Sequence, residues 1–217
     1  MIKEILKELD IKHVKLVAVS KTKPIAQILE LYQVGQRVFG ENKVQELVEK
    51  AELMPKDIEW HMIGHLQKNK VKFIAPFVSL IHSVDSFELI AEIDKYAAKN
   101  NRIIDCLLQF YIAQEDTKFG LSLQEGQELL NSKQFTQLEN IRIVGVMGMA
   151  TFTDNKTQVK AEFNQLKHIF DEIKSTYFKN EDCFIEISMG MSDDYKIAVE
   201  AGSTMVRIGS LLFGKRF

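Results

Sequence analysis

The chain has 217 residues, 46% of them hydrophobic, and its 28 basic and 30 acidic residues give a formal net charge of −2. This length is sufficient for one sizeable core but tight for two domains. The balanced charge argues against a nucleic-acid or polyanion surface, which normally shows a basic excess, so the composition indicates a small ligand rather than a polymer.

The N-terminal MIKEILKELD has the pattern of an amphipathic helix without the apolar core of a signal peptide. No stretch reaches the roughly 18 apolar residues of a membrane span. Cys106 and Cys183 each stand in an apolar run rather than at paired, metal-like spacing. Two buried free thiols in a reducing compartment are the simplest interpretation, so we expect a cytoplasmic protein.

Short apolar runs alternate with longer helical patterns along the chain, which is typical of repeated βα units and a parallel sheet. Helical spacing follows the first, fourth and sixth runs, in PIAQILELYQVG, SFELIAEIDKYAAKN and VKAEFNQLKHIFDEIK. Pro24 suits a first helical turn and Gly35 a helix end. The predicted strands are 14–21, 37–41, 59–64, 80–84, 103–112, 141–149, 184–189 and 205–209.

Eight strands with intervening helices predict an α/β fold, a single (β/α)8 TIM barrel over residues 1–217. An open, doubly wound sheet is the alternative. Against it, no strand is followed by GxGxxG or GxxxxGK[ST], and no Pro/Gly/Ser-rich linker marks a domain boundary. Periodicity alone does not establish closure, and it leaves residues 213–217 as either a last helix or a tail.

In a parallel barrel the working residues lie at the carboxyl ends of the strands, because those ends converge on one mouth. The chain places polar or small residues at most of these ends. They are Ser20, Lys21, Lys23, Glu41, Asn42, His61, Gly64, His65, His82, Ser83, Asp85, Thr151, residues 188–192, Arg207, Gly209 and Ser210.

Two of these ends together predict an anion pocket. Residues 188–192 read SMGMS and lead into a helix, and small residues with free N–H groups at a helix start bind anions. Ordinary turn chemistry accounts equally well for this loop alone. The next strand, however, delivers Arg207 and then Gly209 and Ser210, and a phosphate site after the seventh and eighth strands is recurrent in such barrels.

Two lysines compete in LVAVSKTKP, residues 16–24. By alternation Lys21 shares a face with Val17 and Val19, so its amine would lie at the mouth above apolar residues. Desolvation there favours the free amine that attacks a carbonyl. Lys23 has the same parity, but Pro24 ends the strand beside it and favours the rim. A solvated lysine at a strand exit is the simpler interpretation, and the pattern does not choose between the two lysines.

His61 and His65 have the spacing of zinc ligands on a helix, but EWHMIGH reads as a strand running into a loop. Gly64 disfavours a continuous helix, and no cysteine or carboxylate completes a site nearby. We therefore expect no metal site and interpret His61 as a hydrogen-bonding residue at the mouth.

Six segments in order resemble the pyridoxal phosphate homeostasis protein family, also called the YggS/PROSC family: LVAVSKTKP, FGENKVQEL, WHMIGHLQKNKVK, HSVDS, SMGMSDDYKIAVEAGSTMVRIG and LFG. The resemblance covers nearly the whole chain. It implies a barrel of the alanine-racemase N-terminal-domain type (PLP fold type III). Pyridoxal 5′-phosphate (PLP) would be held as a Schiff base on the lysine of VSKTKP, here Lys21.

The resemblance also implies the other cofactor contacts. The phosphate contacts fall on Ser192, Gly209 and Ser210, and the arginine beside the pyridine nitrogen is Arg207. Further mouth residues of the family pattern are Asn42 and His61. The chain departs from the pattern in Lys43, where tyrosine is common, and in Ser210, where threonine is frequent. QFYIAQED replaces a Val-Asn strand end, so Phe110 and Tyr111 leave no asparagine for that role.

An arginine, always protonated, disfavours a protonated pyridine nitrogen and with it the electron-sink behaviour of many PLP enzymes. The resemblance thus implies a PLP carrier or regulator in vitamin B6 and amino-acid homeostasis, without a catalytic residue. A small PLP-dependent amino-acid racemase is the alternative. Such racemases add a β-domain after the barrel, whereas only GKRF follows LLF here. Small amino acids and PLP-requiring apo-enzymes are candidate partners, and we expect a monomer.

Overall fold

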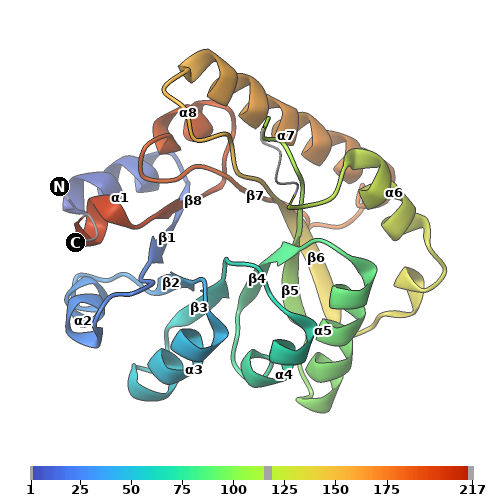
Figure 1. The fold of residues 1–217 in the computed structure, drawn as a ribbon, viewed down its shortest axis with the longest axis horizontal. Coiled ribbons are helices and arrows are strands. Elements are labelled where there is room, and N and C mark those ends of the chain that lie inside the picture. The colour runs from blue at the N-terminus through green and yellow to red at the C-terminus, as the bar shows by residue number, and fades with distance from the viewer. Residues whose placement is uncertain (1, 115–118, 215–217) are drawn as a thin grey trace.

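Eight parallel strands close into a barrel in their order along the chain, and the last strand pairs with the first (Figure 1). This computed structural model describes residues 2–114 and 119–214. The closed (β/α)8 barrel is confirmed, and the open doubly wound sheet is excluded. The strands are β1 (Lys15–Val19), β2 (Val38–Glu41), β3 (Glu59–Met62), β4 (Leu80–Val84), β5 (Ile104–Gln109), β6 (Ile141–Met147), β7 (Glu186–Ser188) and β8 (Met205–Ile208).

Every predicted strand is present, but most are shorter than the apolar pattern suggests. The fifth is the clearest case, because β5 ends at Gln109 and Phe110 makes only an isolated bridge with Leu121. Phe110 and Ile112 are nevertheless buried. Apolar residues continue beyond the hydrogen-bonded ladder because the following loop also packs on the barrel, so hydrophobicity reports burial rather than strand pairing.

The helices surround the barrel on its outside (Figure 1). The longer ones are α1 (Ile2–Ile11), α2 (Ile25–Gln33), α3 (Val44–Leu53), α5 (Phe87–Lys99), α6 (Leu123–Asn131) and α7 (Lys156–Tyr177). The short ones are η1 (Lys68–Lys70), α4 (Val71–Ile74), η2 (Phe135–Gln137), α8 (Tyr195–Glu200) and α9 (Ser210–Phe213). The helices predicted after the first, fourth and sixth strands form as α2, α5 and α7.

The helix of the first βα unit begins and ends next to Pro24 and Gly35, close to where these residues predict its boundaries. Pro24 caps the start of α2 with φ −68°, and Gly35 follows its end at φ +103°. At the other end of the chain, the segment that sequence left as helix or tail begins as α9, which ends at Phe213. Residues 215–217 of that segment lie outside the described residues.

The barrel interior is packed in layers rather than open, as is usual for this fold. An apolar cluster inside it comprises Val17, Leu80, Leu107, Val144, Met147 and Met205. Four polar side chains are buried in the barrel strands as well: His61, His82, Ser188 and Arg207. A larger apolar cluster fills the space between the strands and the helices. The packed side chains therefore fill the barrel interior beneath the carboxyl ends of the strands.

The cysteines differ more than their similar contexts suggest. Cys106 is fully buried, and burial raises the pKa of its thiol, whereas Cys183 is only partly buried. Within the two described ranges, no group of three or more His, Cys, Asp or Glu residues could hold a metal ion. None of the helices described combines the length and apolar character needed to cross a bilayer.

Candidate functional site

A cavity of about 300 Å³ opens at the carboxyl ends of the strands. This volume is at the lower end of the range for small-molecule sites. Six of the seven cofactor contacts implied by the sequence line it: Lys21, Asn42, Ser192, Arg207, Gly209 and Ser210. They follow or belong to β1, β2, β7 and β8, so barrel closure brings together segments nearly 190 residues apart.

Lys21 reaches this cavity because of the alternation along β1. Val17 lies in the apolar cluster inside the barrel, and Val19 lines the cavity above it. Lys21 is the next residue of the same parity and lines the cavity as well, partly buried. Ser20, of opposite parity, is fully buried on the other side of the strand. The end of β1 therefore directs the Lys21 side chain into the mouth cavity and the Ser20 side chain to the opposite, buried face of the strand.

The peptide groups on either side of Lys21 are held by a buried ionic cluster, here called the Lys50 cluster, formed by Ser20, Glu41, Glu46 and Lys50. Lys50 Nζ donates to the Ser20 carbonyl oxygen at 2.7 Å and to Oε1 of Glu41 and of Glu46, each at 2.7 Å. Glu46 Oε1 in turn accepts from the Thr22 N–H at 2.5 Å. The Lys21 loop is thus fixed from both sides.

Burial dominates the electrostatics of this cluster. It raises the pKa of the Glu41 carboxyl, while the hydrogen bonds from Lys50 and Ser20 act in the opposite direction. Glu41 Oε2 is buried and, within the part of the chain the structure describes, has no hydrogen-bond partner. Sequence reasoning placed Glu41 at a strand end but missed Lys50. A signal was present in the sequence, because Lys50 stands three residues after Leu47, on the face of α3 that is buried.

Lys23 also lines the mouth cavity, at its rim. Its Nζ donates to the carbonyl oxygen of Phe213 at 3.0 Å and to that of Gly214 at 3.4 Å. These contacts join the first βα loop to the end of α9, a connection that only barrel closure makes possible.

The two predicted phosphate segments lie against each other. The Gly209 N–H donates to Ser192 Oγ at 3.3 Å, and the Arg207 N–H donates to the Gly190 carbonyl oxygen at 2.9 Å. Asp194 Oδ1 accepts from the Met191 N–H, and burial raises the pKa of the Asp194 carboxyl. The loop after β7 and the loop after β8 therefore form one surface of the cavity.

Arg207 is the buried cation of the site. Its NH1 donates to the carbonyl oxygen and to Oγ of Ser188, at 2.8 and 2.7 Å, and its NH2 donates to the Gly148 carbonyl oxygen at 3.0 Å. Burial lowers the pKa of the guanidinium to about 10, so the group stays charged near neutral pH. No carboxylate among the described residues forms an ion pair with it, which suits a wall that meets an electron-rich or anionic ligand.

His61 lies deeper in the barrel than the sequence predicts. It is only 2% exposed, hydrogen-bonds to His82, and is not among the residues that line the mouth. Ile63, two residues further along the same face, takes the mouth position of that strand. The reason is register: β3 begins at Glu59, so Glu59, His61 and Ile63 lie at successive depths on one face. Alternation gives the face of a residue but not its depth.

The apolar part of the mouth was not foreseen either. Met149 and Phe152 line it and are 41% and 85% exposed. Both follow β6, and Thr151, the polar residue that the sequence analysis placed at this strand end, donates to Glu162 and is not among the residues that line the mouth.

The alanine racemase N-terminal domain family matches residues 2–216. A pyridoxal phosphate homeostasis protein of Aquifex aeolicus is 42% identical over 204 residues, covering 93% of this chain and 87% of that protein. PipY of Synechococcus elongatus is 35% identical, and its structures without PLP and with PLP bound superpose with TM-scores of 0.89 and 0.85 over 99% of this chain and 100% of theirs. Alanine racemase of Bartonella henselae, 16% identical, shares the fold, with a TM-score of 0.68 over 97% of this chain and 59% of that one.

Proposed function

The chain belongs to the pyridoxal phosphate homeostasis protein family, as its six motifs predict, and on this basis we propose that it binds PLP covalently on Lys21 in the mouth cavity. The observation that carries the proposal is the convergence of an amine, a buried guanidinium and a hydroxyl-rich double loop on one cavity. The relative PipY, solved with PLP bound, supports it.

The residues of the cavity fit the three reactive parts of PLP. Lys21 supplies the amine for its aldehyde. Ser192 and Ser210 supply hydroxyls, and the backbone beside them supplies N–H donors, for a phosphate monoester. Arg207 faces the same cavity and suits the ring nitrogen, which accepts a hydrogen bond. Asn42 lines the wall between β1 and β3 and suits a remaining polar edge of the ring.

When bound, PLP would supply an electron sink for negative charge at the α-carbon of an amine that has condensed with its aldehyde, most strongly with a protonated ring nitrogen. Arg207 opposes that protonation, because it is already charged and can only donate hydrogen bonds. The residues of this chain therefore hold the cofactor while restraining its chemistry, which favours a carrier that takes part in vitamin B6 and amino-acid homeostasis.

The racemase alternative has weaker support. The likeness to alanine racemase extends to the fold alone. Met149 and Phe152 leave the mouth accessible to water in the described part of the chain, and open access favours side reactions. The proposal further includes a cytoplasmic monomer that delivers PLP to apo-enzymes and meets small amino acids at the open mouth.

Covalent attachment is tested by adding PLP, reducing with borohydride and mapping the modified peptide. We expect the absorption band of lysine-bound PLP and a label on Lys21. Lys21→Ala should lose both, while the matched control Lys23→Ala should keep both. A band that persists in Lys21→Ala, with the label moved to Lys23, would show that the wrong lysine is assigned.

Carrier and racemase are separated by incubating the PLP-loaded protein with L-amino acids in deuterium oxide. We expect little exchange at the α-carbon and little D-isomer. Exchange at rates typical of dedicated enzymes would overturn the carrier and favour the racemase.

A further inference from the structure

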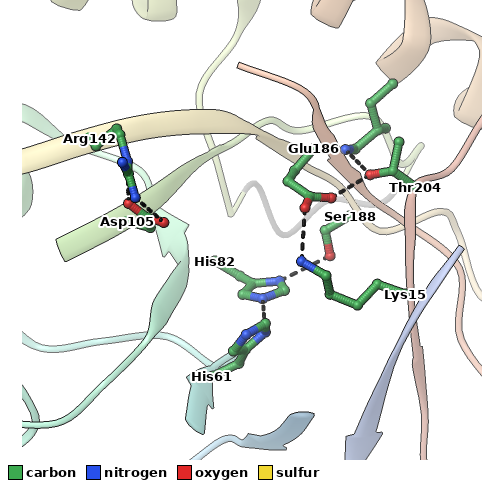
Figure 2. A network of polar contacts seen from close by, with 9 residues as sticks. Lys15, His61, His82, Asp105, Arg142, Glu186, Ser188 and Thr204 are labelled. Carbon is green, nitrogen blue, oxygen red and sulfur yellow. Dashed lines mark hydrogen bonds and ion pairs between the residues drawn. The ribbon is translucent and has the colours of Figure 1, made fainter. Parts of the chain in front are cut away.

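Three side chains behind Arg207 form a continuous hydrogen-bonded series inside the barrel. Arg207 NH1 lies 2.7 Å from Ser188 Oγ, and Ser188 Oγ lies 3.0 Å from His82 Nδ1. His82 Nε2 lies 3.0 Å from His61 Nδ1 (Figure 2). The four residues come from β8, β7, β4 and β3, and each is at most 4% exposed. This series is called the histidine chain below.

The guanidinium sets the direction of every hydrogen bond in the histidine chain. Arginine only donates, so Ser188 Oγ accepts from Arg207. The buried Ser188 O–H still needs an acceptor, and among the contacts described for it His82 Nδ1 is the group within reach, so the serine donates to His82. Burial, aided by the positive charges of Arg207 and Lys15, keeps the pKa of His82 well below its usual range, so His82 is neutral and carries its proton on Nε2. That proton is donated to His61 Nδ1, which leaves His61 with its own proton on Nε2.

The far end of the histidine chain is closed by charged residues. His61 lines a second cavity at the amino ends of the strands, together with Lys15 and Glu186, whose ion pair spans 3.0 Å (Figure 2). Arg142 and Asp105 form a second ion pair there, at 2.7 Å. Burial, and secondarily the positive charge of Lys15, lower the pKa of His61 to about 3. Both histidines are therefore neutral at any pH where the protein works.

We propose that Ser188, His82 and His61 are positioning residues for Arg207, forming a one-way hydrogen-bond chain that fixes the guanidinium against the cofactor ring. Two neutral histidines and a serine occupy a volume that apolar side chains fill elsewhere in this barrel, and buried polar groups are costly unless they bond fully. Here each group bonds only in the order that Arg207 imposes. The inference rests on the proposed function, because Arg207 matters only if it meets the ring.

The direction of the histidine chain is testable without cofactor, by long-range ¹H–¹⁵N NMR of the apo protein. We expect His61 and His82 as neutral Nε2–H tautomers from about pH 5 to about pH 9. The signals of His13, His65 and His168, whose side chains are exposed, serve as internal references for imidazoles in contact with solvent. In Arg207→Met the serine is released, so both histidines should become tautomer mixtures together. An Nδ1–H form in the wild type, or unchanged tautomers in Arg207→Met, would overturn the proposal.

The consequence for the cofactor is tested with a matched pair at one position. His82→Leu removes the acceptor for Ser188, and we expect PLP affinity to fall about tenfold with a shifted absorption band. His82→Asn keeps an acceptor oxygen near the place of Nδ1 and should restore most of both. If His82→Leu does not fold, Ser188→Ala, which also frees Arg207, replaces it with the same expectation.

The outcomes separate this inference from the proposed function. A wild-type protein that fails to bind PLP would refute the proposed function, while the tautomer experiment still decides the direction of the chain. A wild type that binds PLP, with folded His82→Leu and Ser188→Ala that match its affinity and spectrum, would refute the positioning role alone.

Discussion

At the scale of single residues, Lys50 supports the loop that carries Lys21 although it does not line the cavity itself. It lies outside the mouth cavity, yet its amine holds the carbonyl of the residue before Lys21 and the carboxylate that accepts from the residue after it. Thr22 has the left-handed φ of +64°, which a threonine adopts only under constraint. The Lys50 cluster supplies that constraint.

We expect Lys50→Met to destabilise the protein by about 3 to 5 kcal/mol, because it leaves Glu41 and Glu46 without their buried counter-charge. PLP attachment should slow as well, since the Lys21 loop loses its anchor. Urea unfolding and stopped-flow absorbance measure the two effects. The matched control is Lys56→Met, whose amine bonds exposed helix-end carbonyls at Ala51 and Glu52 and should cost less than about 1 kcal/mol. Equal losses in the two variants would refute the role of the Lys50 cluster.

At the scale of elements, the site depends on how loops are shaped between a strand and a helix. The loop from β7 to α8 turns at Gly190, which has φ +94° and whose hypothetical Cβ would lie 2.5 Å from Ala198 Cβ. The loop must pass this close to α8 for Ser192 to meet Gly209. Glycine is therefore required here both by backbone conformation and by space.

Gly190→Ala should cost more than about 2 kcal/mol and weaken PLP binding, because strain and a clash act together. The chain offers a matched control in Gly35, which has a similar φ of +103° but no atom within 4 Å of its hypothetical Cβ. Gly35→Ala should cost about 1 kcal/mol through conformation alone and leave PLP binding unchanged. Thermal unfolding with PLP titration tests both, and equal costs would mean that the close approach to α8 does not matter.

At the scale of the whole molecule, the buried histidines couple folding to pH. Burial lowers the folded-state pKa of His61 to about 3, from the ordinary histidine value of 6.5. The unfolded chain therefore binds more protons below 6.5, so stability is complete above that pH and is lost as pH falls toward about 3. The pKa of His82 is shifted in the same direction.

Protonation of His61 should lower the free energy of unfolding by about 2 kcal/mol between about pH 7 and about pH 5, and His82 should act in the same direction. Urea unfolding at several pH values measures the slope. His61→Gln should make it shallower than the matched substitution His168→Gln does at an exposed position of α7. The same slope in wild type and His61→Gln would show that His61 is not buried as a neutral group.

The sequence by itself determined the order of strands and helices, the parity of the first strand and, through the family resemblance, the identity of six mouth residues. These follow from local rules: a period of two or 3.6 residues, a helix start at Pro24, and a family motif around Lys21. Such rules act between neighbours along the chain, so one sequence carries them completely.

Only the tertiary structure decided depth and partnership. It lowered His61 from the mouth into the barrel, joined it through His82 and Ser188 to Arg207, and placed Lys50 behind the loop that presents Lys21. Alternation along one strand does not depend on the register of that strand with its neighbours. The partners of a buried polar group, however, are set by that register and by closure of the barrel. The sequence predicted which reactive side chains lie at the mouth. The buried hydrogen bonds that orient Lys21 and Arg207 arise from the packing of eight strands.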